Sequence, residues 1–169
     1  GGGGECAAVI SADSTFVLDA LTLEDKSKCS LYMAHSKLVA DKLTFDGDYL
    51  VLSESETTVG KAAIEANTAV IKGAECTVTV AHLDVRATSV AVERAEVSGG
   101  VMSFQSKNED SRLALILGHE ADVKVAKNLT LPGQTNVSAW GVVALSDGAR
   151  LRVADGGTAA RDGTSISLT

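Results

Sequence analysis

The feature that most constrains the fold is a repeat of about twenty residues, built from short apolar runs and short polar connectors. Three columns of runs recur from residue 21 to residue 100, and successive runs in a column lie 19 to 22 residues apart. The first column holds Leu21-Thr22-Leu23, Leu43-Thr44-Phe45, Ala63-Ile64 and Leu83-Asp84-Val85. The second holds Leu31-Tyr32-Met33, Leu50-Val51-Leu52, Ala69-Val70-Ile71 and Val90-Ala91-Val92. The third holds Leu38-Val39, Thr58-Val59, Thr77-Val78-Thr79-Val80 and Glu96-Val97.

Each run alternates as a strand with one buried face does, and the connectors are too short to contain a crossover helix. A hairpin meander has no reason to repeat three strands at a time, whereas a coil that closes every twenty residues does. The repeat therefore predicts a right-handed parallel β-helix, a β-solenoid, with three short strands per coil of about 20 residues. We expect Ala63, Ala69 and Ala91 to point inward and let the narrow interior close.

The same rows extend in both directions. Ala8-Val9-Ile10 and Phe16-Val17-Leu18 fit an earlier row. Later rows are formed by Val101 to Phe104, Leu113 to Leu117, Val123 to Val125, Leu129 to Leu131, Trp140 to Val143 and Leu151 to Val153. We expect one solenoid domain over residues 1–169, with Gly1 to Gly4 outside it as an end or linker. No amphipathic capping helix is evident, so we expect the chain to be a segment of a longer solenoid or to have its ends covered by partner subunits.

One polar stretch breaks the twenty-residue rhythm and is predicted to be an inserted loop. Loops that project from a rigid scaffold are where contacts with partners concentrate. The candidate partner-contact residues are Gln105, Ser106, Lys107, Asn108, Glu109, Asp110, Ser111 and Arg112. A second projecting loop is expected at Gln134 to Asn136.

Composition excludes several classes of partner. The formal net charge is −7, which argues against nucleic acid, because phosphate binding needs a positive face. The longest apolar stretch, Leu113 to Leu117, is far shorter than a spanning helix requires, so no membrane insertion is expected. No Ser-His-Asp set, phosphate loop or dinucleotide fingerprint stands out, and aromatic residues make up only 4% of the chain. We therefore expect no enzyme activity and no cofactor.

Metal and redox signals are weak. His35, His82 and His119 are expected to be separate, solvent-facing residues, and no metal site is predicted. The three cysteines, Cys6, Cys29 and Cys76, have unrelated spacings and are expected to be buried thiols, with a single Cys6–Cys29 bridge left open. Asn128 and Asn136 fit the glycosylation acceptor pattern, which matters only in a secreted eukaryotic protein.

An acidic edge is expected where the first column turns into the second. Glu24, Asp46 and Glu65 recur there, and Asp48 lies nearby. An ordinary solvent-exposed acidic edge accounts for these carboxylates. The alternative is a carbohydrate-active β-helix enzyme or a calcium-dependent carbohydrate-binding module, which requires Asp46, Asp48 and Glu65 to converge.

Two resemblances accompany the repeat. The Leu-Thr-Leu, Leu-Thr-Phe and Leu-Asp-Val runs, together with the tail from Asp147 to Thr158, resemble β-helical passenger segments of autotransporter and filamentous-haemagglutinin-like surface proteins. This resemblance implies a secreted, surface-exposed stalk that displays loops and has no active site. The segment from Val92 to Gly100 resembles bactofilin-type polymerising β-helices.

These features predict a structural and adhesive spacer that presents loops in an extracellular or cell-surface assembly. Its partners are expected to be a surface protein or glycan, or adjoining solenoid segments joined end to end. The second alternative is a self-polymerising scaffold of the bactofilin kind, which would be cytoplasmic.

Overall fold

The chain folds as an all-β solenoid. The computed structural model describes residues 9–24, 29–108, 111–132, 140–146, 148–161 and 164–165. Within these ranges the strands are β1 (Val9–Ala12), β2 (Thr15–Glu24), β3 (Leu31–Ala34), β4 (Lys37–Asp46), β5 (Tyr49–Ser53), β6 (Glu56–Lys72), β7 (Thr77–Glu93), β8 (Glu96–Ser106), β9 (Arg112–Leu117), β10 (Asp122–Leu131), β11 (Trp140–Leu145), β12 (Arg150–Val153), β13 (Thr158–Arg161) and β14 (Thr164–Ser165). No described helix is long and apolar enough to cross a membrane.

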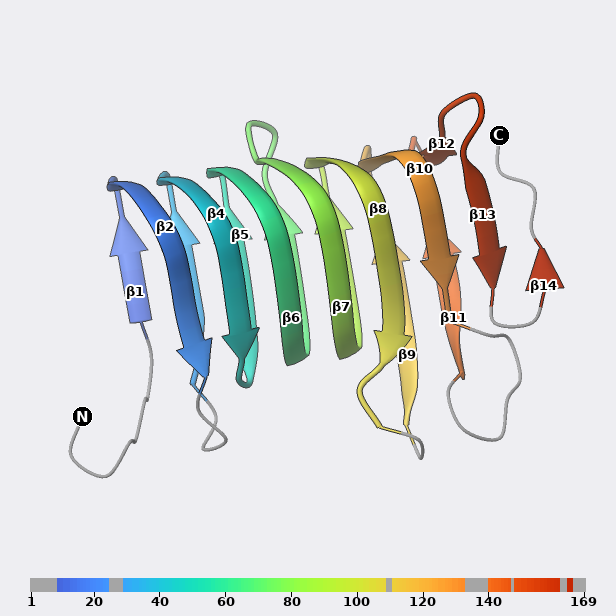
Figure 1. Ribbon diagram of the computed structural model, residues 1–169, viewed down its shortest axis with the longest axis horizontal. Helices are drawn as coiled ribbons and strands as arrows, with labels where there is room; N and C mark the ends of the chain where they lie inside the picture. Colours follow the sequence, from blue (N-terminus) through green and yellow to red (C-terminus); the bar gives the residue numbers. More distant parts are fainter. Residues whose placement is uncertain are drawn as a thin grey trace.

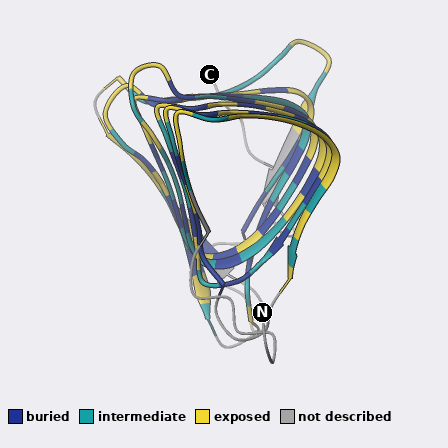
Figure 2. Cartoon of the chain, turned by 90° about the vertical axis from the view of Figure 1, so that its left-hand side faces the viewer, coloured by how far each residue is buried: buried dark blue, intermediate teal, exposed yellow. Residues whose placement is uncertain are grey.

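Figure 1 shows the direction of winding. The chain rises on the far side through β1, β5 and β9, crosses the top, and descends on the near side through β2, β4 and β6 as it advances to the right. This winding is right-handed, as predicted. Figure 2, which looks along the axis, shows a triangular cross-section with three sheet faces.

We name the three faces by the strands that build them. Face A contains β1, β3, β5, residues 68–72, residues 89–93, β9 and β11. Face B contains residues 15–18, 37–40, 56–59, 77–80, 96–99 and 122–125 and β12. Face C contains residues 20–24, 42–46, 61–65, 82–86, 101–105 and 128–131 and β13. All these pairings are parallel, and only β13 and β14 pair antiparallel among the described strands.

The strand register confirms the columns predicted from the repeat. On face A, Leu31 pairs with Leu50 and Leu50 with Ala69. On face C, Phe45 pairs with Ile64 and Ile64 with Val85. Because each coil lies in register on the next, residues about one coil apart stack into aliphatic columns along the axis, which supply the hydrophobic core.

The expectation for the small inward residues is right for one alanine and wrong for two. Ala69 is buried, with 4% of its surface exposed. Ala63 is exposed and Ala91 is half-buried, because both occupy the outward phase of their strands. Ala63 pairs with outward-facing Thr44, so the inward alanine of that strand is Ala62.

The corner between faces A and B is a repeated tight turn. Asp13, His35, Glu54 and Arg94 have φ between 47° and 55°, and Gly73 adopts φ 112° at the equivalent position. The backbone N–H of each donates to a carbonyl of the following coil, for example from His35 to Ser53 at 3.1 Å. The next residue is serine in three coils, and the Ser36 N–H donates to Ser55 Oγ at 3.1 Å. These bonds tie successive coils together where the strands are interrupted.

The cysteines differ from one another in their chemistry. Cys76 is a free thiol, 1% exposed, whose Sγ donates to the Leu52 carbonyl at 3.6 Å. Burial raises the pKa of this thiol, so it behaves as a small apolar residue, as predicted. Cys29 is disulfide-bonded, so the expectation of a free thiol is wrong at that position. Cys6 lies outside the described residues.

Candidate functional site

The corner between faces C and A, which we call the loop corner, carries the predicted insertion. In the coil before it, Ala87 and Ser89 on β7 are separated by one residue. Their partners in the next coil, Ser106 and Ala114, are separated by seven residues, so this coil has six extra residues. The prediction of an inserted loop is thus confirmed, and Figure 2 places this corner at the bottom of the triangle.

Only some of the predicted loop residues lie in the turn. Gln105 and Ser106 end β8, and Arg112 begins β9, so these three belong to strands. Lys107, Asn108 and Ser111 form the described part of the turn, whereas Glu109, Asp110 and the second expected loop at 134–136 lie outside the described residues. The projecting segment is therefore shorter than the stretch marked by composition.

Internal hydrogen bonds hold the base of this turn. Ser106 is 7% exposed, and its Oγ lies 2.8 Å from the Asn108 carbonyl oxygen and 3.0 Å from Ser111 Oγ. The Ser111 N–H donates to the Asn108 carbonyl at 3.2 Å. The buried serine at the end of β8 thus contacts both sides of the turn, and Asn108 is exposed to solvent.

A polar chain links the loop to two earlier coils. Lys107 Nζ donates to Asn67 Oδ1 at 3.1 Å, and Asn67 Nδ2 donates to Asp48 Oδ1. Asp48, Asn67 and Lys107 lie 19 and 40 residues apart in sequence and meet because the coils stack. Asn67 is the member that sequence reasoning missed, and its place one coil after Asp48 is the signal that could have revealed it.

The acidic edge predicted from the sequence lies on face C. Glu24, Asp46 and Glu65 stack in one ladder on face C, and Arg86 and Gln105 continue it. The ladder borders a shallow hollow of about 300 Å³ that Thr44, Ala63 and Asp84 also line. Asp48 points to Asn67 instead. No group of three His, Cys, Asp or Glu side chains that could hold a metal ion occurs in the described part of the chain.

The three histidines lie apart. His35 Nε2 is 3.1 Å from Glu54 Oε2, and His119 Nε2 is 3.7 Å from Glu120 Oε1, both at the corner between faces A and B. His82 lies on face C, between Lys61 and Val101 in the ladder. All three are exposed, as the sequence predicted. Of the two glycosylation candidates, Asn136 lies outside the described residues. Asn128 is exposed and accepts a hydrogen bond from Thr158 Oγ1 at 2.8 Å.

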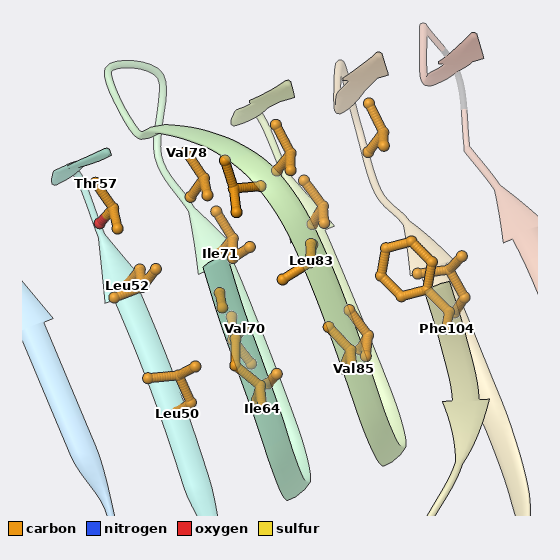
Figure 3. A pocket seen from close by; sticks show the side chains of 18 of the residues that line it. Leu50, Leu52, Thr57, Ile64, Val70, Ile71, Val78, Leu83, Val85 and Phe104 are labelled. Carbon is orange, nitrogen blue, oxygen red and sulfur yellow. The ribbon is translucent and has the colours of Figure 1, made fainter. Parts of the chain in front are cut away.

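The interior contains a narrow apolar cavity of about 40 Å³. Aliphatic side chains from all three faces line it, including Leu52, Val78 and Leu83, and Figure 3 shows the Thr57 hydroxyl among them. Thr57 is 2% exposed, and among the described residues its Oγ1 is the one buried side-chain oxygen or nitrogen without a hydrogen-bond partner. Its ladder neighbours are Leu38 and Val78, so a hydroxyl occupies a position that its column fills with hydrocarbon.

Replacing Thr57 with valine is therefore expected to stabilise the protein by about 1–2 kcal/mol. Valine keeps the shape of the side chain and removes the cost of burying an unpaired hydroxyl. Thr58→Val is the matched control, because Thr58 is the exposed neighbour on the same strand. The free energy of unfolding, measured in urea, should rise for the first variant and stay nearly constant for the second. A loss of stability in Thr57→Val would show that the hydroxyl is satisfied in solution.

No protein-family model matches the chain, and neither a curated protein nor a solved structure does.

Proposed function

We propose that this chain is a non-enzymatic structural and adhesive spacer that presents surface loops in a larger extracellular or cell-surface assembly. The observation that carries the proposal is the parallel stacking from β1 to β13, in which each coil pairs with the next and the register shifts only between Val125 and Asn128 among the described pairings. Such stacking makes a stiff rod from backbone hydrogen bonds and a continuous aliphatic core. A stiff rod holds whatever projects from its corners at a defined distance and orientation.

The insertion at the loop corner supports a role in display. Six extra residues leave the strands on either side in register, so stacking of the coils does not require this length of chain at the corner. The base of the turn is nevertheless ordered by Ser106 and tied to Asn67 through Lys107. A segment whose length is not required for stacking and whose described base is held by hydrogen bonds is suited to contact a surface protein or glycan.

The disulfide at Cys29 supports the extracellular setting. Disulfides persist in oxidising compartments and are uncommon where cellular thiols keep cysteines reduced.

Deleting residues 107–112 tests the assignment of the contact. Joining Ser106 to Leu113 gives this coil the same corner length as the coil before it, so the rod is expected to stay folded by circular dichroism. Binding of the labelled chain to arrays of glycans and immobilised extracellular proteins is expected to fall to background. Lys124→Ala, on exposed face B, is the matched control and should bind as the parent does. If the deletion variant binds as well as the parent, the loop corner is not the contact; if it unfolds, the loop is structural and the proposal fails.

A further inference from the structure

Face A differs from the other two faces in what it exposes. The middle outward position of its strands is apolar in every described coil, and the column consists of Tyr32, Val51, Val70, Ala91, Ile116 and Ala144. Tyr32 is 37% exposed and Ile116 41%. Face C carries charged residues throughout its outward columns, including Lys42, Asp46, Glu65, Asp84 and Arg86. Face B carries Lys37, Glu56 and Glu96 beside its corner with face A, and Lys124 in its middle outward column.

The charges on face A are confined to its margins. Among its described outward residues, Lys72 and Glu93 lie beside the corner with face B, and Arg112 lies beside the loop corner. Between these margins the outward column nearest the loop corner consists of Tyr49, Thr68, Ser89, Ala114 and Val142. An uncharged, largely apolar strip of this kind on an exposed sheet face is typical of an interaction surface.

We propose that face A is the surface through which two copies of this chain pair side by side. The six strands that face each other in the pair occupy about 29 Å at about 4.8 Å per strand, and five residues make the strip about 17 Å wide. Each copy thus contributes about 500 Å², so a pair buries about 1,000 Å². This area is at the lower bound for a specific protein interface and well below that of an obligate dimer. The pair is therefore reversible.

A second copy is the occupant because the strip is complementary to itself. A two-fold axis that runs nearly parallel to the strands, between Val70 and Ala91, reverses the order of the coils in the second copy. It places Val70 opposite Ala91, Val51 opposite Ile116 and Tyr32 opposite Ala144. In the neighbouring column it places Tyr49 opposite Ala114. The two tyrosines thus face alanines, as interdigitating sheets require.

The marginal charges fit the same axis. Lys72 and Glu93 are ladder neighbours in adjacent coils. The axis between these coils places Lys72 of one copy opposite Glu93 of the other, twice per pair. Opposite charges at the rim fix the register of an interface, and like charges there oppose it. In this arrangement the loop corners of both copies lie along the same edge of the pair.

The first experiment measures the association of the 169-residue chain by sedimentation equilibrium over a wide concentration range. The parent is expected to form a reversible dimer. Ile116→Asp places two carboxylates in the dry centre of the interface and is expected to weaken the dimer about a hundredfold. Thr79→Asp, an exposed outward position on face B, is the matched control and should leave the dimer unchanged. A monomeric parent, or equal weakening by both substitutions, would overturn the proposal.

The second experiment tests the register by exchanging charges. Lys72→Glu and Glu93→Lys are each expected to weaken the dimer about tenfold, and the double exchange to restore it. Failure of the double exchange to restore association overturns the two-fold arrangement. Phe16→Asp distinguishes association through the ends of the solenoid from association through face A, because Phe16 lies in the first coil and is 38% exposed. If Phe16→Asp abolishes association and Ile116→Asp does not, the copies join end to end and the proposal is wrong.

Discussion

Replacing Gly47 with alanine is expected to destabilise the protein by about 3 kcal/mol. Gly47 lies in the turn between β4 and β5, where the chain passes close to the preceding coil. A Cβ atom there would lie 2.1 Å from the Cys29 carbonyl oxygen and 2.9 Å from Phe45 Cζ. The backbone has little freedom to move away, because the Gly47 N–H donates to Glu65 and the Asp48 N–H to Cys29. Overpacking against fixed backbone costs this order of free energy.

Gly118→Ala is the matched control for this prediction. Its Cβ would meet its nearest neighbours, Glu93 and the Val92 carbonyl, at 3.4 Å, an ordinary contact. We expect its free energy of unfolding to stay within about 0.5 kcal/mol of the parent's. Urea unfolding followed by circular dichroism measures both variants under the same conditions. Similar losses in the two would contradict the view that close approach of backbones, and not glycine itself, matters at residue 47.

Phe45→Ala is expected to cost about 3–5 kcal/mol, the largest effect of any single substitution considered for this chain. Phe45 is 1% exposed and stacks between Leu23 and Ile64 in the face C column. Removing the ring leaves a cavity between two coils, which also weakens the nearest-neighbour coupling on which a solenoid depends. The first coil then has less to pack against, so this coil should unfold at a lower temperature than the later coils.

The neighbouring residue provides the control for Phe45. Thr44 lies on the same strand and points outward, so Thr44→Ala should change stability by less than about 0.5 kcal/mol. Thermal and urea unfolding report the difference between the two variants. A small effect of Phe45→Ala would mean that the column does not behave as a close-packed core.

The fold was predictable from the sequence because few topologies satisfy its constraints. Runs such as Leu43-Thr44-Phe45 have the two-residue period of a strand, and connectors of three to five residues exclude crossover helices. Parallel stacking at a fixed period then follows. The phase within a run was harder to assign: Ala63-Ile64 has no flanking large residue on its N-terminal side, so Ala63 could be placed inward, where Ala62 is.

The candidate site was predictable only in outline. The loss of periodicity at 105–112 marked an insertion, but composition did not show that β8 extends through Ser106. The polar chain from Asp48 to Lys107 depends on side-chain contacts across coils, which spacing alone does not specify. The apolar outer column of face A was visible in runs such as Leu31-Tyr32-Met33, whose middle residue is not polar. Counting those middle residues column by column would have separated face A from faces B and C.

The extra residues at the loop corner have a consequence for how the sequence of such a solenoid can vary. Glu24 pairs with Asp46, and Leu31 pairs with Leu50, although the connection from Glu24 to Leu31 is three residues longer than that from Asp46 to Leu50. The insertion within 105–112 lengthens the same corner by six residues and also leaves the neighbouring strands in register. Doubling a surface loop adds only about 0.6 kcal/mol of closure entropy. Foreign peptides grafted at this corner would therefore lower the stability of the solenoid only slightly. The binding specificity of the corner can then vary while the stability of the scaffold stays nearly constant.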